Sequence, residues 1–379
     1  MIDLPADGTY VTRVWRQGLG PALALLRGDI LHDITSRDAP TMRDLLERDD
    51  LAAWLAAQPD NPIGTLAAIA AASVEPEGET TRLMSPADLQ AIKACGVTFA
   101  RSMIERVIEE RAAGDASRAE AIRQRVAAAI GDSLRNLRPG SPEAAEVKRL
   151  LQAENLWSQY LEVGIGPDAE VFTKAPPMAS VGYGASVGLH PVSKWNNPEP
   201  EVVLAVNSRG EIKGATLGND VNLRDVEGRS ALLLGKAKDN NAAASIGPFI
   251  RLFGEGFGLE HVRTLELTLT VEGRDGFTLQ GRSSMSEISR DPADLVAQTI
   301  GRHHQYPDGF MLYCGTMFAP VQDRDGPGQG FTHHLGDLVT IATPELGALR
   351  NTVRLATEAP AWSFGTAALM RNLAARGLL

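Results

Sequence analysis

Two glutamates and one aspartate are the residues of this chain whose types and spacing most clearly indicate chemistry. Glu199 and Glu201 stand two positions apart in the run NNPEPE at 196–201. On an extended chain, residues two apart face the same side, so the two carboxylates point in one direction. Asp220 follows in the segment GNDV at 218–221, and the residues SRG at 208–210 predict a turn between them. Two antiparallel strands joined by that turn would bring Asp220 back to the glutamates.

Three carboxylates that converge repel one another unless a cation neutralises them. An all-oxygen ligand set suits Mg²⁺, Mn²⁺ or Ca²⁺ better than Zn²⁺. The sequence therefore predicts a hard divalent ion as cofactor, held by Glu199, Glu201 and Asp220. The spacing alone fits a second interpretation equally well, in which two exposed glutamates lie on a proline-containing edge strand and Asp220 lies in a turn.

Composition limits the classes of partner. The chain has 379 residues, 44% of them apolar, and a formal net charge of −10. This predicts a large core and a small-molecule substrate, because nucleic acids and anionic membranes require a basic surface. Cys95 and Cys314 are too few for a disulfide framework, and the first ten residues carry no signal-peptide pattern. We expect reduced thiols, no membrane span and a cytoplasmic location.

The elements that must position the carboxylates are mostly strands. Alternation and turn residues predict a β-rich N-terminal unit with strands at 11–15, 21–26 and 30–32, a helix at 42–57 and a boundary at 61–85. Helices are predicted at 102–113 and 115–137, with a third beginning at Ser141. After Gly164 the pattern predicts strands, among them 201–206, 265–271, 310–318, 338–341 and 346–353. The fold class is α+β and mostly β.

Several motifs occur in a fixed order along 156–379: EPE at 199–201, GNDVNLRD at 218–225, Lys238 ahead of a Gly-Pro pair, and Gly-Thr at 315–316. With them the chain resembles the fumarylacetoacetate hydrolase family. The resemblance implies a mixed β-sandwich roll, with a small N-terminal domain at 1–80 and a catalytic domain at 81–379 that contains a helical insertion at about 101–155. It also implies that Glu199, Glu201 and Asp220 hold the metal and that Lys238 and Thr316 line the substrate pocket.

One departure from the family pattern narrows the expected reaction. Hydrolases of the family carry an H-x-x-E step, and in this chain Ser102 stands where the histidine would be, while Glu105 is retained. The chain is similar to the branch that dehydrates 2-keto-3-deoxy-pentonates, including the element EVFTK at 170–174. The resemblance implies proton transfer by Glu105 and Glu170, charge stabilisation by Lys238, and substrate contacts from the remaining polar residues of these motifs, Ser102, Lys174, Arg224 and Thr316.

The expected function is metal-dependent dehydration of a 2-keto-3-deoxy-pentonate to 2,5-dioxopentanoate by a homodimer or homotetramer. Two alternatives remain open: a hydrolase that cleaves acylpyruvates, and a non-catalytic protein that binds 2-oxo acids. Without the resemblance, the charge run at 105–111 reads as a solvated helix face, Glu170 as a strand-edge charge and Lys238 as a surface lysine.

Two further features carry weaker signals. Adjacent histidines occur at 303–304 and 333–334, but neither pair has the spacing of a transition-metal site. The glycine-rich segment 323–330 is either a surface turn or, by its position in the family, a lid over the pocket. Neither feature changes the expected function.

Overall fold

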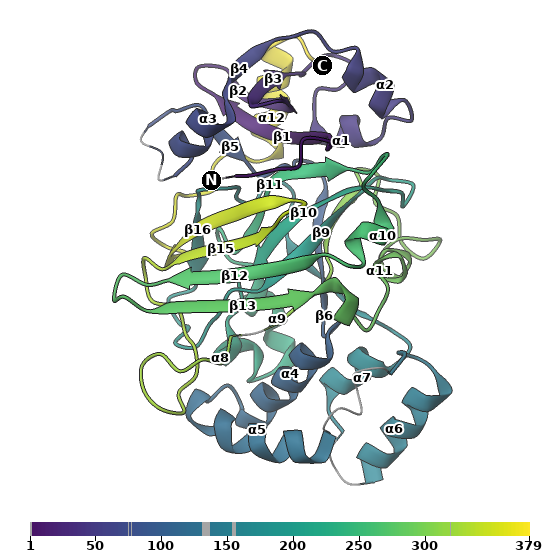
Figure 1. Cartoon of the computed structure of the whole chain (residues 1–379), viewed down its shortest axis with the longest axis vertical. Coiled ribbons are helices and arrows are strands. Elements are labelled where there is room, and N and C mark those ends of the chain that lie inside the picture. Colours follow the sequence, from purple (N-terminus) through teal and green to yellow (C-terminus); the bar gives the residue numbers. More distant parts are fainter. Residues whose placement is uncertain (1, 75, 77, 131–136, 154–156, 319) are drawn as a thin grey trace.

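The computed structural model describes residues 2–74, 76, 78–130, 137–153, 157–318 and 320–379, and side chains at 100–102 and 124–130 lie outside that description. Three parts follow one another along the long axis (Figure 1): an N-terminal unit, a body made of two sheets, and a group of helices at the opposite end. Among the described residues, no helix combines the length and the apolar character that a membrane crossing requires.

The larger sheet runs from the N-terminal unit through the body. Strands β1 and β11 pair antiparallel, with Tyr10 opposite Arg251, so that both parts share one sheet. Within the body β14 and β6 pair parallel, whereas β9, β10 and β11 pair antiparallel. The strands in spatial order are β4 (Pro62–Thr65), β3 (Ile30–Asp33), β2 (Gly20–Arg27), β1 (Tyr10–Arg16), β11 (Ala244–Leu252), β10 (Ile212–Asp220), β9 (Pro200–Val206), β14 (Phe310–Tyr313), β6 (Ala91–Gly96) and β7 (Glu170–Ala175), with β5 (Arg82–Met84) beside β1.

The smaller sheet packs face to face on the larger one. Alternate residues of β12, such as Leu267 and Leu269, are buried and share a hydrophobic cluster with Val202 and Leu204 of β9. The polar residues between them face outward, as expected for a sheet with one solvated side. In spatial order its strands are β13 (Thr278–Ser284), β12 (Glu266–Glu272), β15 (Leu338–Thr343), β16 (Gly347–Leu355) and β8 (Ser186–Leu189).

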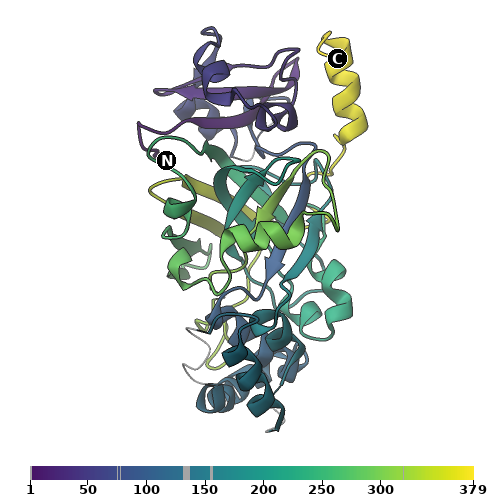
Figure 2. The same cartoon turned by 90° about the vertical axis from the view of Figure 1, so that its right-hand side faces the viewer.

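Helices cover both ends of the molecule. Figure 2 shows the C-terminal helix beside the N-terminal unit, where Asn372 donates to the Leu19 carbonyl at 2.8 Å. The helices around this unit are α1 (Met42–Leu46), α2 (Leu51–Ala56), α3 (Leu66–Ala72) and α12 (Thr366–Ala375). The helical insertion contains α4 (Ala100–Ala112), α5 (Ala116–Ile130), α6 (Pro142–Ala153) and α7 (Gln159–Ile165), and shorter helices around the body are α8 (Arg224–Glu227), α9 (Leu234–Lys238), α10 (Leu259–Val262) and α11 (Pro292–Thr299).

The predicted N-terminal strands and the helix that begins after Ser141 are confirmed. The single helix predicted at 42–57 is wrong, because the exposed polar residues between Leu46 and Leu51 separate two short helices. At this interruption the Glu47 carboxylate accepts hydrogen bonds from the backbone N–H and the hydroxyl of Ser208, at 2.7 and 2.8 Å. These contacts hold the residues between the two helices in place.

The segment 61–85, predicted to contain a boundary, includes β4 and β5, which pair with β3 and β1 of the N-terminal unit. The division of the chain near residue 80 stays a prediction. The strand predicted at 310–318 ends at Tyr313, and Gly315 then takes a left-handed conformation with φ of 104°. Glycine adopts that conformation without strain.

Candidate metal and catalytic site

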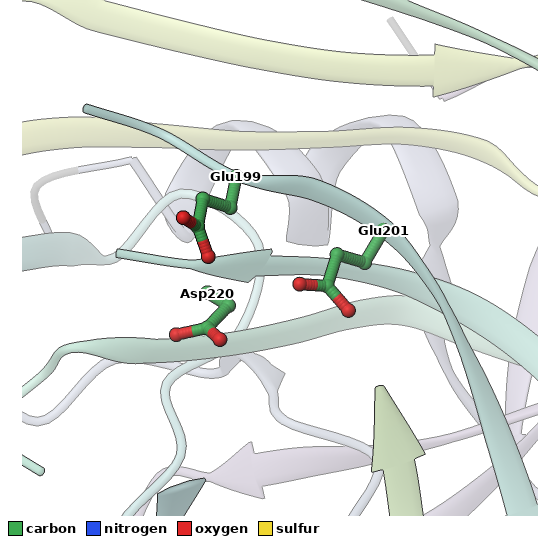
Figure 3. A group of neighbouring side chains, drawn as sticks. All are labelled: Glu199, Glu201 and Asp220. Atoms are coloured by element: carbon green, nitrogen blue, oxygen red, sulfur yellow. The ribbon is translucent and has the colours of Figure 1, made fainter. Parts of the chain in front are cut away.

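The predicted return of Asp220 to the two glutamates is confirmed. Strand β9 pairs with β10 so that Glu201 lies opposite Gly218, and the Asp220 N–H donates to the Glu199 carbonyl at 3.1 Å. One carboxylate oxygen from each of Glu199, Glu201 and Asp220 lies within 4.8 Å of the others. Figure 3 shows the three side chains pointing into a common space between their strands. All three are buried, so the interpretation as exposed edge residues is wrong.

The three carboxylates have different partners. Glu199 accepts from Lys238 at 2.6 Å and from Arg106. Burial raises its pKa, but the charges of Lys238 and Arg106 outweigh burial and lower the pKa of Glu199 to about 2. Glu201 accepts only from neutral donors, the Gly315 N–H at 2.7 Å and the Thr316 hydroxyl at 3.3 Å. Burial, together with neighbouring Asp220 and Glu199, raises the pKa of Glu201 well above its usual value.

Two lysines hold Asp220 from opposite sides. Lys238 lies 3.1 Å from one oxygen of Asp220, and Lys174 lies 2.7 Å from the other. Lys174 is fully buried and also donates to the carbonyls of Val221 and Lys238, at 3.1 and 2.5 Å. Lys174 is therefore saturated by protein partners. Lys238 bridges Glu199 and Asp220, so the interpretation of Lys238 as a surface lysine is wrong.

A small cavity of about 10 Å³, room for roughly one water molecule, adjoins these carboxylates. Glu170 lies on its wall, and its pKa is raised because burial outweighs the opposing charges of Arg106 and Lys238. A Cβ at position 96 would overlap the Glu170 carboxylate, so the absence of a side chain at Gly96 makes room for it. The residues around the cavity are Cys95, Gly96, Val97, Arg106, Glu170, Phe172, Glu199, Asp220, Glu227, Lys238 and Thr316.

Two of these residues escaped the sequence analysis. Glu227 lies at the end of α8, and burial, more than any other influence, raises its pKa to about 7. Arg106 on α4 is buried and donates to Glu109 at 2.5 Å. The prediction of a solvated face for the charge run at 105–111 is wrong for Arg106 and Glu109, which pack inward at i, i+3 spacing. That spacing, beside buried Met103 and Val107, is the signal that could have identified them.

The other predicted site residues lie apart from the cavity. Glu105 contacts Arg224 at 3.0 Å and Arg123 at 2.9 Å. Burial opposes these partners, but they hold the pKa of Glu105 below its usual value. Arg224 also donates to Glu109 at 2.6 Å and to the Pro320 carbonyl at 3.1 Å. The predicted roles of Glu105 and Arg224 stay predictions, and the side chain of Ser102 lies outside the described residues.

The donor set fits a divalent cation. Of the residues described around the cavity, four carboxyl groups lie beside two cationic side chains, so two carboxyl groups have no cation of the protein to match them. A divalent ion supplies two positive charges, and oxygen-only ligands suit Mg²⁺, Mn²⁺ or Ca²⁺. The carboxyl groups are Glu170, Glu199, Asp220 and Glu227, and the cations are Arg106 and Lys238.

Comparison with known proteins points to one family. Residues 162–354 match the family described as fumarylacetoacetate (FAA) hydrolase, C-terminal. The chain is 34% identical over 195 residues to a Haloferax volcanii protein named "Probable 2-keto-3-deoxyxylonate dehydratase", covering 51% of this chain and 63% of that protein. It is 30% identical over 187 residues to the 2-dehydro-3-deoxy-D-arabinonate dehydratase of Saccharolobus solfataricus, covering 49% and 58% of the two chains. The matched region spans less than two thirds of either relative.

Solved structures show the same fold. The apo form of 2-keto-3-deoxy-D-arabinonate dehydratase superposes with a TM-score of 0.64 at 18% identity, covering 91% of this chain and 99% of that one. The same enzyme complexed with magnesium and 2,5-dioxopentanoate gives a TM-score of 0.62 at 18% identity, with the same coverage. Fumarylacetoacetate hydrolase from Exiguobacterium antarcticum gives 0.56 at 13% identity, covering 92% and 99%. These likenesses confirm the predicted fold class.

Proposed function

Because the chain belongs to the fumarylacetoacetate hydrolase family, we propose that it dehydrates a 2-keto-3-deoxy-pentonate to 2,5-dioxopentanoate with a bound divalent ion. The observation that carries the proposal is the meeting of Glu199, Glu201 and Asp220 within 4.8 Å beside the buried acid Glu170. The names of the two relatives, both dehydratases of 2-keto-3-deoxy-pentonates, support the substrate class.

The residues of the chain have separate tasks. Glu199, Glu201 and Asp220 are the proposed ligands of Mg²⁺, with Mn²⁺ or Ca²⁺ as substitutes. The bound ion supplies Lewis acidity toward the carboxylate and the 2-oxo group of the substrate. Lys238 lies 2.6 Å from Glu199 on the same cavity, where its positive charge stabilises negative charge that develops on the substrate oxygen.

The dehydration step needs two proton transfers. One carboxylate removes a proton from C3, and an acid protonates the hydroxyl that leaves C4 as water, which gives an unsaturated 2-oxo acid with a C3–C4 double bond. Loss of a C5 proton and protonation at C3 then form an enol at C5, and its tautomerisation gives 2,5-dioxopentanoate. Glu170 is one of the two groups, because it lies on the cavity wall and burial raises its pKa, which favours its protonated form. Glu105 is the other group predicted from sequence, and Glu227 is a second candidate because it lies on the cavity wall.

Burial helps these groups in two ways. Desolvation raises the pKa of both Glu170 and Glu227, and it brings that of Glu227 to about 7, where a carboxyl group both donates and accepts protons near neutral pH. The small enclosed cavity also excludes bulk water, which strengthens the interaction between Lys238 and an anionic intermediate. Thr316 holds Glu201 at 3.3 Å and so orients a proposed metal ligand from the cavity wall.

Purified protein tests the proposal directly. The protein is mixed with 2-keto-3-deoxy-pentonate and Mg²⁺, and formation of 2,5-dioxopentanoate is followed by mass spectrometry. Turnover is expected with Mg²⁺ and is expected to disappear in EDTA. Cleavage of acylpyruvates without dehydration would support the hydrolase alternative. Thermal stabilisation by pyruvate and Mg²⁺ without any product would support the non-catalytic binding protein.

We further propose that the protein acts in the cytoplasm as a homodimer or homotetramer. The cytoplasmic location is supported by the buried free thiols of Cys95 and Cys314. The oligomeric state rests on the family resemblance, and light scattering of the purified protein measures it.

A further inference from the structure

Arg106 occupies a position that none of the expected metal or proton-transfer groups explains. Its guanidinium lies among three carboxylates, Glu109 of the same helix and Glu199 and Glu227 from distant parts of the chain. One terminal nitrogen contacts Glu109 at 2.5 Å and Glu227 at 3.1 Å, while the other donates to Glu199. The side chain belongs to α4 of the helical insertion and forms part of the cavity wall. A residue of the insertion thus reaches a proposed metal ligand.

The other cations of the site have no free donor geometry for a substrate. Lys174 is held by Asp220 and two backbone carbonyls. Arg224 is held by Glu105, Glu109 and the Pro320 carbonyl, away from the cavity wall. Of the residues described around the cavity, Lys238 and Arg106 are the cations. Unlike a lysine, the Arg106 guanidinium has a second terminal nitrogen besides the one that Glu109 and Glu227 hold.

One terminal nitrogen of Arg106 donates to Glu199, and Glu199 is also a proposed ligand of the metal. A divalent ion that binds the Glu199 carboxylate competes with Arg106 for that carboxylate, since both are positively charged. Glu109 and Glu227 continue to hold the other terminal nitrogen. The terminal nitrogen that contacts Glu199 would then be available, on the cavity wall, to the negative carboxylate of a 2-oxo acid.

We propose that Arg106 binds the carboxylate of the 2-oxo acid substrate and thereby selects anionic over neutral substrates. In the metal-free protein the same guanidinium neutralises Glu199. The inference rests on the proposed function for the class of substrate, and it assigns Arg106 a task that the metal ligands and proton-transfer groups do not perform. Because Arg106 comes from α4, substrate recognition also involves the helical insertion.

Binding of pyruvate and of its neutral analogue pyruvamide to the Mg²⁺-loaded protein tests the inference by isothermal titration calorimetry. The wild-type protein is expected to bind pyruvate more tightly than pyruvamide. Arg106→Gln removes a charge-assisted hydrogen bond, so pyruvate affinity should fall on the order of 10- to 100-fold with little change for pyruvamide. Mg²⁺ affinity should stay equal or rise, because a competitor for Glu199 is gone.

Two further variants keep the result interpretable. Arg106→Lys keeps the charge next to Glu109 and Glu227, but its single nitrogen cannot hold these carboxylates and also reach a substrate, so it should fold and still lose about tenfold in pyruvate affinity. Arg149→Gln removes an exposed arginine from α6 of the same insertion and serves as the matched control. A merely structural role for Arg106 would lower the melting temperature without changing the ratio of pyruvate to pyruvamide affinity.

The outcomes separate this inference from the proposed function. If the wild-type protein dehydrates its substrate and Arg106→Lys keeps both its KM and the pyruvate preference, the inference is wrong and the proposed function stands. If the wild-type protein neither turns over a keto-deoxy acid nor binds pyruvate with Mg²⁺, the proposed function fails and the inference falls with it. Loss of the pyruvate preference in both Arg106 variants, with Mg²⁺ binding retained, supports the inference.

Discussion

Two buried groups of charged residues differ in how well their charges are matched. Around the cavity, Glu201 has neutral donors as hydrogen-bond partners, and its pKa is raised well above the usual value by burial and by neighbouring carboxylates. Near β15, Asp337 accepts from both terminal nitrogens of Arg324 at 2.6 and 2.8 Å. Burial opposes ionisation there, but Arg324 and His333 outweigh it and lower the pKa of Asp337.

This difference distinguishes a structural ion pair from a site suited to binding a ligand. A buried carboxylate that serves the fold is matched by a cation of the protein, as Asp337 is by Arg324. A buried carboxylate whose charge the protein leaves unmatched carries a proton until a cation arrives. His333 also belongs to the matched group, because it contacts Asp337 at 3.2 Å, and the backbone N–H of His334 donates to the same carboxylate. The adjacent histidines 333 and 334 therefore have a structural role beside Arg324.

The largest expected effect comes from Glu201→Gln. Burial and the neighbouring carboxylates raise the pKa of Glu201 and so favour its neutral form, which glutamine resembles in shape and charge. The melting temperature in EDTA should therefore change little. Mg²⁺ affinity, measured by calorimetry, should fall on the order of a thousandfold or more, and turnover should disappear. Unchanged Mg²⁺ affinity would remove Glu201 from the ligand set. Glu272→Gln, an exposed change on β12, is the control.

Glu170→Gln tests the proton-transfer role proposed for the carboxyl groups around the cavity. Loss of a general acid or base lowers kcat by about a hundredfold to ten-thousandfold, while Mg²⁺ affinity should stay near wild type. Steady-state kinetics of Glu105→Gln and Glu227→Gln then identify the second group. We expect the larger loss of kcat for the residue on the cavity wall, Glu227. A kcat near wild type for Glu170→Gln would contradict its proposed role.

Asp337→Asn tests the matched group. Asparagine cannot neutralise Arg324, whose side chain is almost completely buried. The free energy of unfolding should fall by roughly 2 kcal/mol in urea denaturation, because Arg324 loses its buried partner and keeps only the half-exposed Asp275 as a carboxylate partner. The loss should be the same with EDTA and with Mg²⁺, and Mg²⁺ affinity should not change. A loss of stability that appears only in EDTA would mean that this group is coupled to the metal site.

The smallest expected effect is on the pH dependence of stability, which should have opposite signs for the two groups of charged residues. Glu227 has a folded-state pKa of about 7, above its usual 4.5, so the native state binds more protons than the unfolded state between these values. Stability of the metal-free protein should therefore decrease as pH rises from 5 to 7, by about 2 kcal/mol for Glu227. The Asp337 contribution has the opposite sign: it is present above the usual pKa of 3.8 and is lost as pH falls below it.

Denaturation curves in EDTA across this pH range check the sign. Glu227→Gln should flatten the decline between pH 5 and 7, because glutamine has no proton to release. Saturating Mg²⁺ should also reduce the decline, since a cation favours ionised carboxylates around the cavity. A metal-free protein whose stability rises steadily from pH 5 to 7 would contradict the assignment of raised pKa values to this group.

The sequence by itself determined the proposed metal ligands and the strands that carry them. Alternation along 201–206, the turn at 208–210 and the motif at 218–221 suffice to bring Glu199, Glu201 and Asp220 together, because strand pairing of a short hairpin is a local matter. The motif order also determined the family, and with it the fold class that similarity to solved structures confirms.

Only the tertiary structure decided which charges of the helical insertion reach the cavity. The run at 105–111 places Glu105 against Arg224 and Arg123 but directs its neighbour Arg106 to Glu199 on a distant strand. Helical periodicity gives the angle between neighbouring side chains, but it does not determine which side of the helix packs against the sheet. The pKa values of Glu201 and Glu227 likewise depend on burial and on charges far along the chain, so no local pattern specifies them.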